Sequence, residues 1–491
     1  MSGRLGLFDK YGGVLRQNID AAQEQAAYDL SRILRFETVN GAEPAERAKF
    51  EQQRDACFAF LGELSARLGF AFRMPTPRVG VIECGEGAET LGVLTHIDVV
   101  PAGKGWTYPP FSGEIADGCI WGRGAQDDKG PLIQFLYALA AVRDAGAPVQ
   151  RRVRIIIGSE EEGGVWSDIE EYLALESAPD ISIVPDSQFP IINGEKGIVT
   201  TRLGLPGLSF SVCESSIRFV LLEAGVAANV VPDEATLVFE IEIDDTQEEF
   251  ERLMAEFDER TGMKRPANIE RDADGKVCST FVFKGHSAHA SLPHAGRNAA
   301  AIALDFLAGI TRAEGGTPPL ISALQQGAKD LKGECFGIHR IHERLGETTC
   351  SLTMLKLTPE AGSAVFNVRQ PFSIEPEEIL NGIASKFDGA TAEFIGKPLR
   401  PIWIDPALHP DFIEALQAAY RCVTGREPKL MSIGGTTYAK ALPNALNFGP
   451  CDEADGEEEL AHQPNERITL EHLRRNLLIY AHALAALIVD E

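Results

Sequence analysis

Seven histidine and acidic residues, spread over most of the 491-residue chain, combine into a set suited to two metal ions of the kind that catalyse hydrolysis. They are His96, Asp98, Asp127, Glu161, Glu162, Asp186 and His462. Apolar, β-branched runs at residues 91–95, 153–157 and 181–184 lead into or towards five of them and predict buried strands. An open α/β sheet presents side chains at the carboxyl ends of its strands. We therefore expect three strands to bring ligands to one sheet edge.

The pattern of strands and helices predicts an α/β protein with an insertion. From about residue 80 to 200, strand-like runs alternate with helix-like runs, which is typical of a mainly parallel sheet flanked by helices. From 197 to roughly 395 the pattern changes to that of a separate α+β unit. If His462 completes a site begun at His96, both chain ends fold together. We expect a catalytic domain made of residues 1–194 and 397–491, with residues 195–396 as an inserted lid domain.

Several helices are expected from apolar residues at helical spacing, and a hinge from turn residues. The helices are predicted over residues 18–36, 44–68, 129–144, 168–176, 410–424 and from 469 onwards. Residues 193–197 are rich in turn formers and are predicted to form the hinge where the insertion leaves the catalytic domain. The length agrees with more than one core, because cores stop growing near ~250 to 300 residues.

Charge and composition exclude several classes of partner. The formal charge of −26 argues against nucleic acid and against an anionic membrane surface, since both bind clustered Lys and Arg. The nine cysteines are scattered without a regular framework, which suits a reducing cytoplasm. No stretch approaches the ~20 apolar residues of a membrane span. The sequence predicts a cytoplasmic protein that binds neither nucleic acid nor membrane.

The acidic residues differ in the chemistry they could perform. Asp98 lies two residues from His96, so in a strand its carboxylate could bond the ring nitrogen that faces away from a metal. Asp127, in the glycine-flanked turn 122–130, could bridge two cations ~3.5 to 4 Å apart. Three consecutive acids at 160–162 cannot all stay charged and close without a cation or a raised pKa. One of them could ligate a metal while its neighbour moves protons. Each motif alone also has an ordinary structural interpretation. His96 could be a hydrogen-bonded structural histidine, the acids of the turn could cap a helix N-terminus, and the acids at 160–162 could be solvated at the start of a helix.

Two further segments offer polar groups in the middle of the chain. Residues 286–294 contain three of the ten histidines, which permits a second metal site or one histidine reaching the main site. The second reading is favoured, because no acid lies nearby in sequence. Arg369, in a strand-like run, carries a planar fork that suits a carboxylate.

Six motifs in order resemble the M20 metallopeptidases, and within them the PepV and Sapep dipeptidase branch. They are residues 95–101, 122–130, 160–162, 184–186, 229–233 and 461–466. The long middle segment and residues 189–197 point to that branch. The resemblance implies two zinc ions, one held by His96, Asp127 and Asp186 and the other by Asp127, Glu162 and His462. Manganese or cobalt would also suit these ligands.

The same resemblance implies roles for the remaining residues. Glu161 is expected to be the general base, with Asp98 orienting His96 and a cis peptide after Asp127. His289 is expected to stabilise the oxyanion, while Asn229, Arg369 and the backbone around Gly435 hold the terminal carboxylate of a small peptide. In shorter relatives a second subunit contributes to the site, and the enlarged insertion resembles one that replaces it. A monomeric dipeptidase is therefore expected.

Two other functions stay open at this point. An N-acyl amino-acid deacylase or desuccinylase would use the same metal chemistry on a different substrate. A non-catalytic, metal-dependent peptide-binding protein would keep the scaffold. Glu161 argues against the binding protein, because binding alone does not require a base.

Overall fold

The computed structural model describes residues 2–41, 43–212, 217–241, 255, 267–271, 277–313 and 316–489. The chain forms two compact units. The two-segment unit contains Met1–Gly194 and Ile402–Glu491, and the inserted unit contains Glu195–Pro401. The chain therefore re-enters the two-segment unit between residues 401 and 402, and not between 396 and 397 as expected. The reason is that Leu399 pairs with Ile198, so the segment before Ile402 stays with the inserted unit.

A nine-stranded sheet forms the centre of the two-segment unit. In spatial order its strands are β1 (Ala71–Thr76), β2 (Val79–Cys84), β6 (Arg152–Gly158), β3 (Thr90–His96), β7 (Ile181–Val184), β23 (Ala445–Asn447), β9 (Ile191–Glu195) and β21 (Ile402–Trp403), with β22 (Leu430–Ile433) paired to β9. The pairs β6–β3, β3–β7 and β7–β23 are parallel, whereas β1–β2, β2–β6 and β23–β9 are antiparallel. The predicted α/β class is confirmed, and the sheet is mixed with a parallel centre.

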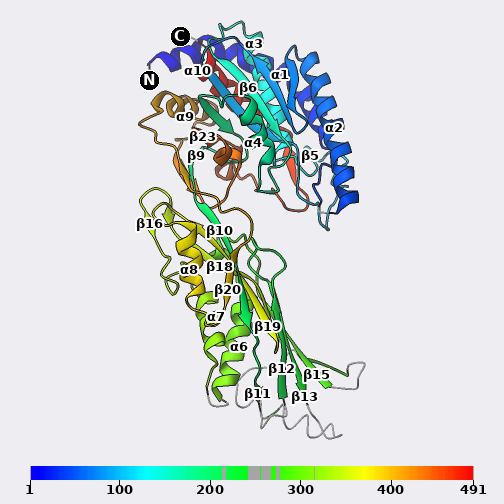
Figure 1. Ribbon diagram of the computed structural model, residues 1–491. Coiled ribbons are helices and arrows are strands. Elements are labelled where there is room, and N and C mark those ends of the chain that lie inside the picture. The colour runs from blue at the N-terminus through cyan, green and yellow to red at the C-terminus, as the bar shows by residue number, and fades with distance from the viewer. Residues whose placement is uncertain are drawn as a thin grey trace. The chain divides into compact units, whose positions relative to one another are not determined.

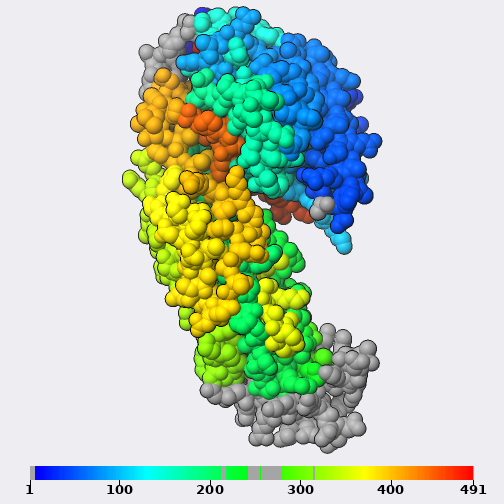
Figure 2. Space-filling view, viewed as in Figure 1, coloured from blue at the N-terminus to red at the C-terminus, as the bar shows by residue number. Residues whose placement is uncertain are grey.

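Helices from both ends of the chain cover this sheet. They are α1 (Ser2–Ile33), α2 (Pro44–Arg67), α3 (Lys129–Asp144), α4 (Ser167–Leu175), α9 (Pro410–Thr424) and α10 (Leu470–Ile488). Helices α1, α3, α9 and α10 pack against one another, while α2 and α4 pack against β1 (Figure 1). The face in Figure 2 likewise carries early residues in blue to green beside late residues in orange. Helix α1 begins well before the predicted residue 18, because Leu7, Phe8 and Leu15 extend its buried face.

Short strands position the loops near the carboxyl edge of the sheet. A three-stranded sheet joins β4 (Glu114–Ala116), β5 (Cys119–Trp121) and β25 (Arg467–Thr469), although β25 is far away in sequence. Strands β8 (Ser187–Gln188) and β24 (Pro450–Cys451) form a second small pair. Two 3-10 helices, η2 (Tyr438–Ala441) and η3 (Glu453–Asp455), complete this region.

The inserted unit has its own sheet and its own hydrophobic core. Its strands in spatial order are β14 (Ala267–Arg271), β15 (Val277–Lys284), β13 (Glu234–Ile241), β12 (Ile217–Ala224), β18 (Thr349–Leu357), β19 (Ala361–Gln370), β10 (Gly197–Pro206) and β20 (Thr391–Phe394), with β11 (Ser211–Val212) paired to β12. Helices α6 (Ala299–Ala313), α7 (Pro319–Lys329) and α8 (Pro376–Ala384) lie along one face (Figure 1). The remaining short elements of this unit are η1 (Pro293–Ala295), β16 (Ile341–His342) and β17 (Gly346–Glu347).

The chain passes between the two units in extended conformation. Residues 193–197, predicted as the hinge where the insertion leaves, contain the boundary between the two units at 194/195 and form the end of β9 and the start of β10, with only Lys196 between the strands. The Asn193 side chain donates to the Ile404 carbonyl at 3.0 Å, which ties the outgoing chain to the returning one. Within the described residues, no helix combines the length and the apolar character needed to cross a membrane.

Candidate metal centre

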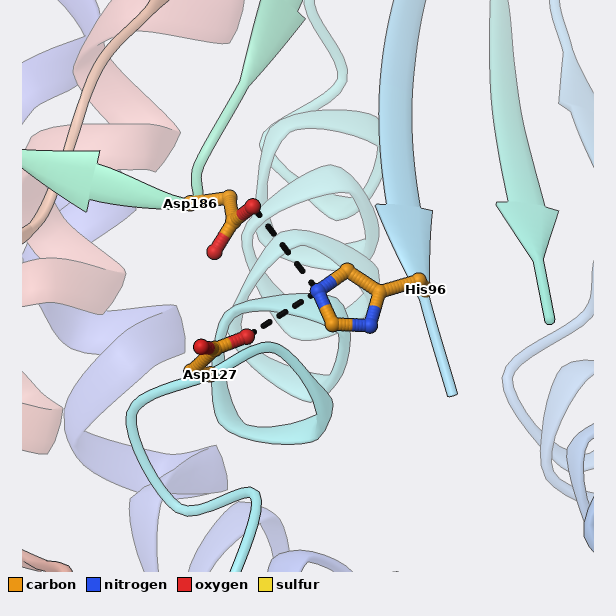
Figure 3. A group of neighbouring side chains, drawn as sticks. All are labelled: His96, Asp127 and Asp186. Carbon is orange, nitrogen blue, oxygen red and sulfur yellow. Dashed lines mark ion pairs between the residues drawn. The ribbon is translucent and has the colours of Figure 1, made fainter. Parts of the chain in front are cut away.

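Three parallel strands end at one edge of the sheet, as the sequence predicts. Strand β3 ends at His96, β6 ends two residues before the acidic run, and β7 ends two residues before Asp186. Asp127 reaches the same place from the turn before α3 (Figure 3). The parallel pairing of β3 with β6 and β7 fixes these strand ends side by side.

The first group of candidate ligands consists of His96, Asp127 and Asp186, whose ligand atoms all lie within 4.8 Å of one another. The Nε2 atom of His96 lies 3.0 Å from Oδ1 of Asp127 and 3.8 Å from Oδ2 of Asp186 (Figure 3). One imidazole and two carboxylates thus converge on a single point.

The second group consists of Asp127, Glu162 and His462. The Nε2 atom of His462 lies 3.0 Å from Oδ2 of Asp127 and 3.1 Å from Oε2 of Glu162. Asp127 therefore belongs to both groups, with Oδ1 towards His96 and Oδ2 towards His462. This is the arrangement expected of a carboxylate that bridges two cations. Among the described residues, these are the only groups able to hold a metal ion.

The candidate ligand atoms are better placed to bind a cation than to form hydrogen bonds with one another. Nε2 of His96, Oδ1 of Asp127 and Oε1 of Glu162 are buried, and within the described part of the chain none has a hydrogen-bond partner. Buried polar atoms normally have such partners. Nε2 and Oδ1 are 3.0 Å apart without hydrogen-bond geometry, so both remain available to a third atom. Imidazole and carboxylate ligands in this number suit zinc or a neighbouring transition metal.

The site concentrates negative charge in a buried place. Burial, together with neighbouring carboxylates such as Asp127, raises the pKa of Asp186 to about 8. Burial and the charge of Asp186 also raise the pKa of Glu161 well above its usual value. Burial opposes the charged form of His462, but Asp127 and Glu162 outweigh it and raise its pKa to about 11. Bound cations would relieve this repulsion.

Asp98 holds more of the site together than the sequence predicts. Nδ1 of His96 lies 3.0 Å from the Asp98 carbonyl oxygen and 3.4 Å from its carboxylate, so the closest partner is the main chain. The carboxylate itself accepts the backbone N–H groups of Glu161 at 3.1 Å and Glu162 at 3.0 Å. The strand alternation behind the prediction fails here, because β3 ends at His96 and Asp98 lies beyond it.

The turn that carries Asp127 is held by a buried ion pair. Glu466 accepts the backbone N–H groups of Gly124, Gln126 and Asp127 and also receives Nη1 of Arg123 at 2.6 Å. Both side chains are fully buried. The peptide between Asp127 and Asp128 is cis, as the resemblance implies. Glu466 belongs to a motif in the sequence, but its contact with Asp127 was not predicted.

The remaining predicted residues lie in two places. Gly435 belongs to the two-segment unit, in the loop before η2, whose Tyr438 contacts the His96 ring edge-on at 6.0 Å. Asn229, His289 and Arg369 belong to the inserted unit. The Ala290 N–H donates to the Asn229 carbonyl, which brings the segments of Asn229 and His289 together. Arg369 is buried on β19, with Nε donating to Asn367 at 2.9 Å. Their roles stay predictions.

A parallel-centred sheet whose carboxyl edge carries two imidazoles and several carboxylates, with one carboxylate shared, defines a metal-dependent hydrolase. Comparison with known proteins agrees. The chain belongs to peptidase family M20/M25/M40, whose family model matches residues 92–486. It is therefore a metallopeptidase that acts on peptide substrates, as its resemblance predicts.

Relatives of similar length support the same family. "Putative dipeptidase YtjP" from Bacillus subtilis (strain 168) is 34% identical over 464 residues, covering 94% of this chain and 97% of the relative. A relative from Staphylococcus aureus (strain Mu50 / ATCC 700699), named in the same way, is 29% identical over 481 residues, covering 97% of this chain and 100% of the relative.

Solved structures share the fold at low sequence identity. Human carnosine dipeptidase 1 is 16% identical with a TM-score of 0.56, covering 96% of this chain and 98% of that chain. The dipeptidase Dug1p from Saccharomyces cerevisiae is 16% identical with a TM-score of 0.55 and the same coverage.

Proposed function

We propose that this metallopeptidase hydrolyses the peptide bond of dipeptides, using two zinc ions and Glu161 as general base. The observation that carries the proposal is Asp127, whose two oxygens face two separate imidazoles, His96 and His462, beside a buried glutamate that belongs to neither ligand group. The names of the relatives from Bacillus subtilis and Staphylococcus aureus support the substrate class.

The proposed ligands are His96, Asp127 and Asp186 for one ion and Asp127, Glu162 and His462 for the other. Manganese or cobalt would fit the same donors. When bound, the ions supply Lewis acidity, which polarises the substrate carbonyl and lowers the pKa of a water molecule. Asp98 and Asp128 support this arrangement, since Asp128 accepts the backbone N–H of His96 at 3.2 Å.

Glu161 is proposed to move the proton. Its side chain is buried beside both candidate ligand groups and belongs to neither, so its carboxylate is available to accept a proton. Glu161 takes one proton from the attacking water as the new C–O bond forms. It returns that proton to the amine nitrogen as the C–N bond breaks, which releases two amino acids and leaves the carboxylate unchanged.

Residues of the inserted unit are proposed to recognise the terminal carboxylate and the reacting carbonyl group of the substrate. Arg369 and Asn229 would bind the terminal carboxylate, and His289 would donate to the oxyanion, with the backbone at Gly435 assisting. Burial lowers the pKa of Arg369 to about 10, so its guanidinium stays charged at neutral pH. Nδ1 of His289 lies 2.6 Å from the Ser291 hydroxyl, a contact that fixes the ring. A clamp on the carboxylate next to the scissile bond favours dipeptides over longer peptides.

The proposed function is tested by turnover of defined substrates. Metal-loaded protein is incubated with a dipeptide panel that includes β-alanyl and Xaa-His dipeptides, and with the matching N-acyl amino acids. We expect free-amine dipeptides to be cleaved faster. Faster cleavage of the acylated substrates would favour a deacylase, and no turnover of any dipeptide would refute the proposal. We further propose that the enzyme works as a monomer in the cytoplasm; a light-scattering mass near twice that of one chain would contradict the first part.

A further inference from the structure

The turn that carries Glu161 and Glu162 is held from behind by groups outside both candidate ligand sets. Four consecutive backbone N–H groups, from Ser159 to Glu162, donate to two carboxylates, and that of Glu160 also donates to the Tyr438 hydroxyl at 3.3 Å. Asp168 accepts the N–H of Ser159 at 2.7 Å and of Glu160 at 3.1 Å. Asp98 accepts the next two. Each of the four N–H groups of the turn therefore has a carboxylate acceptor.

Tyr438 completes this arrangement from a distant part of the chain. Its hydroxyl donates to Oδ2 of Asp168 at 2.6 Å, the same oxygen that receives both backbone N–H groups. The ring is fully buried, and it meets His96 edge-on with centroids 6.0 Å apart. Tyr438 therefore contacts a candidate ligand of the first metal while bonding the residue that holds the turn of Glu162, a candidate ligand of the second.

The packing beneath this pair leaves no room for a side chain. Gly158 ends β6 immediately before the turn, and a Cβ atom there would collide with the Tyr438 hydroxyl and the Asp168 carboxylate. Trp166 also packs edge-on against Tyr438 at 5.9 Å and donates its indole N–H to the Glu161 carbonyl at 3.0 Å. The turn is therefore held by both its N–H groups and a carbonyl group.

We propose that the Asp168–Tyr438 pair is a positioning device that keeps Glu161 and Glu162 in different roles, one as base and one as metal ligand. This inference rests on the proposed function of those two glutamates. Adjacent side chains on a mobile turn could exchange places, because both are carboxylates of equal length. Fixing all four N–H groups fixes the direction of each Cα–Cβ bond, so that of the two glutamates it is Glu162 that faces His462.

Tyr438→Phe tests the pair with the smallest change, since it keeps the ring on His96 and removes only the hydroxyl, which donates to Asp168 and accepts the Glu160 N–H at 3.3 Å. Tyr480→Phe is the matched control. Tyr480 is equally buried and stacks on Phe135 at 4.1 Å, but within the described residues its hydroxyl has no hydrogen-bond partner. Asp168→Asn is a second variant, in which one acceptor oxygen remains.

Two measurements are made on the full-length protein. Zinc affinity is measured by competition with a chelating dye, which requires no substrate. Because groups that hold metal ligands in place typically change affinity by about 10- to 100-fold, we expect at least a tenfold loss for Tyr438→Phe and Asp168→Asn and none for Tyr480→Phe. On a cleaved dipeptide, we expect kcat to fall about tenfold or more with KM changed by less than about threefold, since displacement of the base affects chemistry more than binding.

The outcomes separate this inference from the proposed function. If Tyr438→Phe matches Tyr480→Phe in zinc affinity and kcat, the positioning role is refuted even though the protein is a dipeptidase. Equal losses of kcat and substrate affinity in Tyr438→Phe would also overturn it. If no dipeptide is cleaved by the natural protein, the proposed function fails, and the zinc titration alone still decides the positioning role. Should Asp168→Asn fail to fold, Tyr438→Phe decides it.

Discussion

Glu466 accepts the backbone N–H of Asp127 at 3.2 Å, although the two residues are 339 positions apart in the chain. The contact ties the loop of His462 to the turn of the shared carboxylate. The buried Glu466 carboxylate thus aligns His462 with Asp127, two candidate ligands of the second group. Loss of this contact affects both groups, because Asp127 belongs to both.

Replacement of Glu466 by alanine should destabilise the protein strongly. It leaves Arg123 buried without its carboxylate partner, and breaking a buried pair in this way typically costs about 3 to 5 kcal/mol. Chemical unfolding of the whole protein measures this loss of unfolding free energy. The matched control is Glu89→Ala, which removes an exposed partner of Arg151 and should cost less than about 1 kcal/mol. Equal losses in the two variants would contradict this account of the Asp127 turn.

Metal binding to the metal-free protein should release protons. The pKa of His462 is raised to about 11 and that of Asp186 to about 8, so both groups hold a proton at neutral pH before a metal arrives. A ligand must lose its proton to bind, so zinc affinity should rise as pH rises from 6 to 8. Calorimetry in buffers of different ionisation enthalpy measures the released protons. Identical heats in all buffers would show that these groups do not bind the metal.

Replacement of Arg369 by lysine should weaken substrate binding more than catalysis. A lysine keeps the charge but loses the planar fork, so kcat/KM is expected to fall about 100-fold, mostly through KM. The effect should disappear for dipeptides whose terminal carboxylate is amidated. Arg202→Lys, at an exposed arginine of the same sheet, is the control. A similar fall on amidated substrates would mean that Arg369 does not bind that carboxylate.

His482 should make the protein less stable in acid. Burial lowers the pKa of its ring, whose Nδ1 lies 2.8 Å from the Leu478 carbonyl, so the folded protein keeps this histidine neutral. A group with a lowered pKa contributes stability above its unfolded value of about 6.5, and that stability is lost as pH falls below it. The difference in thermal midpoint between the natural protein and His482→Gln should therefore shrink from pH 7.5 to pH 5. A constant difference would contradict this.

Part of the candidate metal centre could be predicted from the sequence because two of its candidate ligands stand at or just after strand ends. His96 and Asp186 follow apolar runs, and parallel pairing of those runs places them together. The contacts of Tyr438 and Glu466 could not be predicted in this way. Their partners lie 270 and 339 residues away, and no local pattern distinguishes a buried tyrosine that supports a turn from one that fills a core.

The fold was predicted in outline and corrected in detail. Alternation of strand and helix indicated the sheet, but not that its outer strands are antiparallel, because the composition of a strand does not record the direction in which it runs. The turn residues at 193–197 predicted the hinge where the insertion leaves, and the boundary between the two units lies among them, although strand pairing keeps these residues extended. Hydrogen bonds to neighbouring strands outweigh the local turn preference of these residues.

The role of Glu161 is the central claim, and kcat of Glu161→Gln with zinc content measured on the same sample tests it most directly. Glu160→Gln is the matched control, since the Glu160 carboxylate pairs with Arg78 at 2.6 Å and belongs to neither ligand group. We expect Glu161→Gln to keep its zinc and lose about 10³-fold in kcat, within the range for a general base, and Glu160→Gln to lose less than about tenfold. A Glu161→Gln variant that keeps both its zinc and a kcat within about tenfold of the natural enzyme would contradict the account.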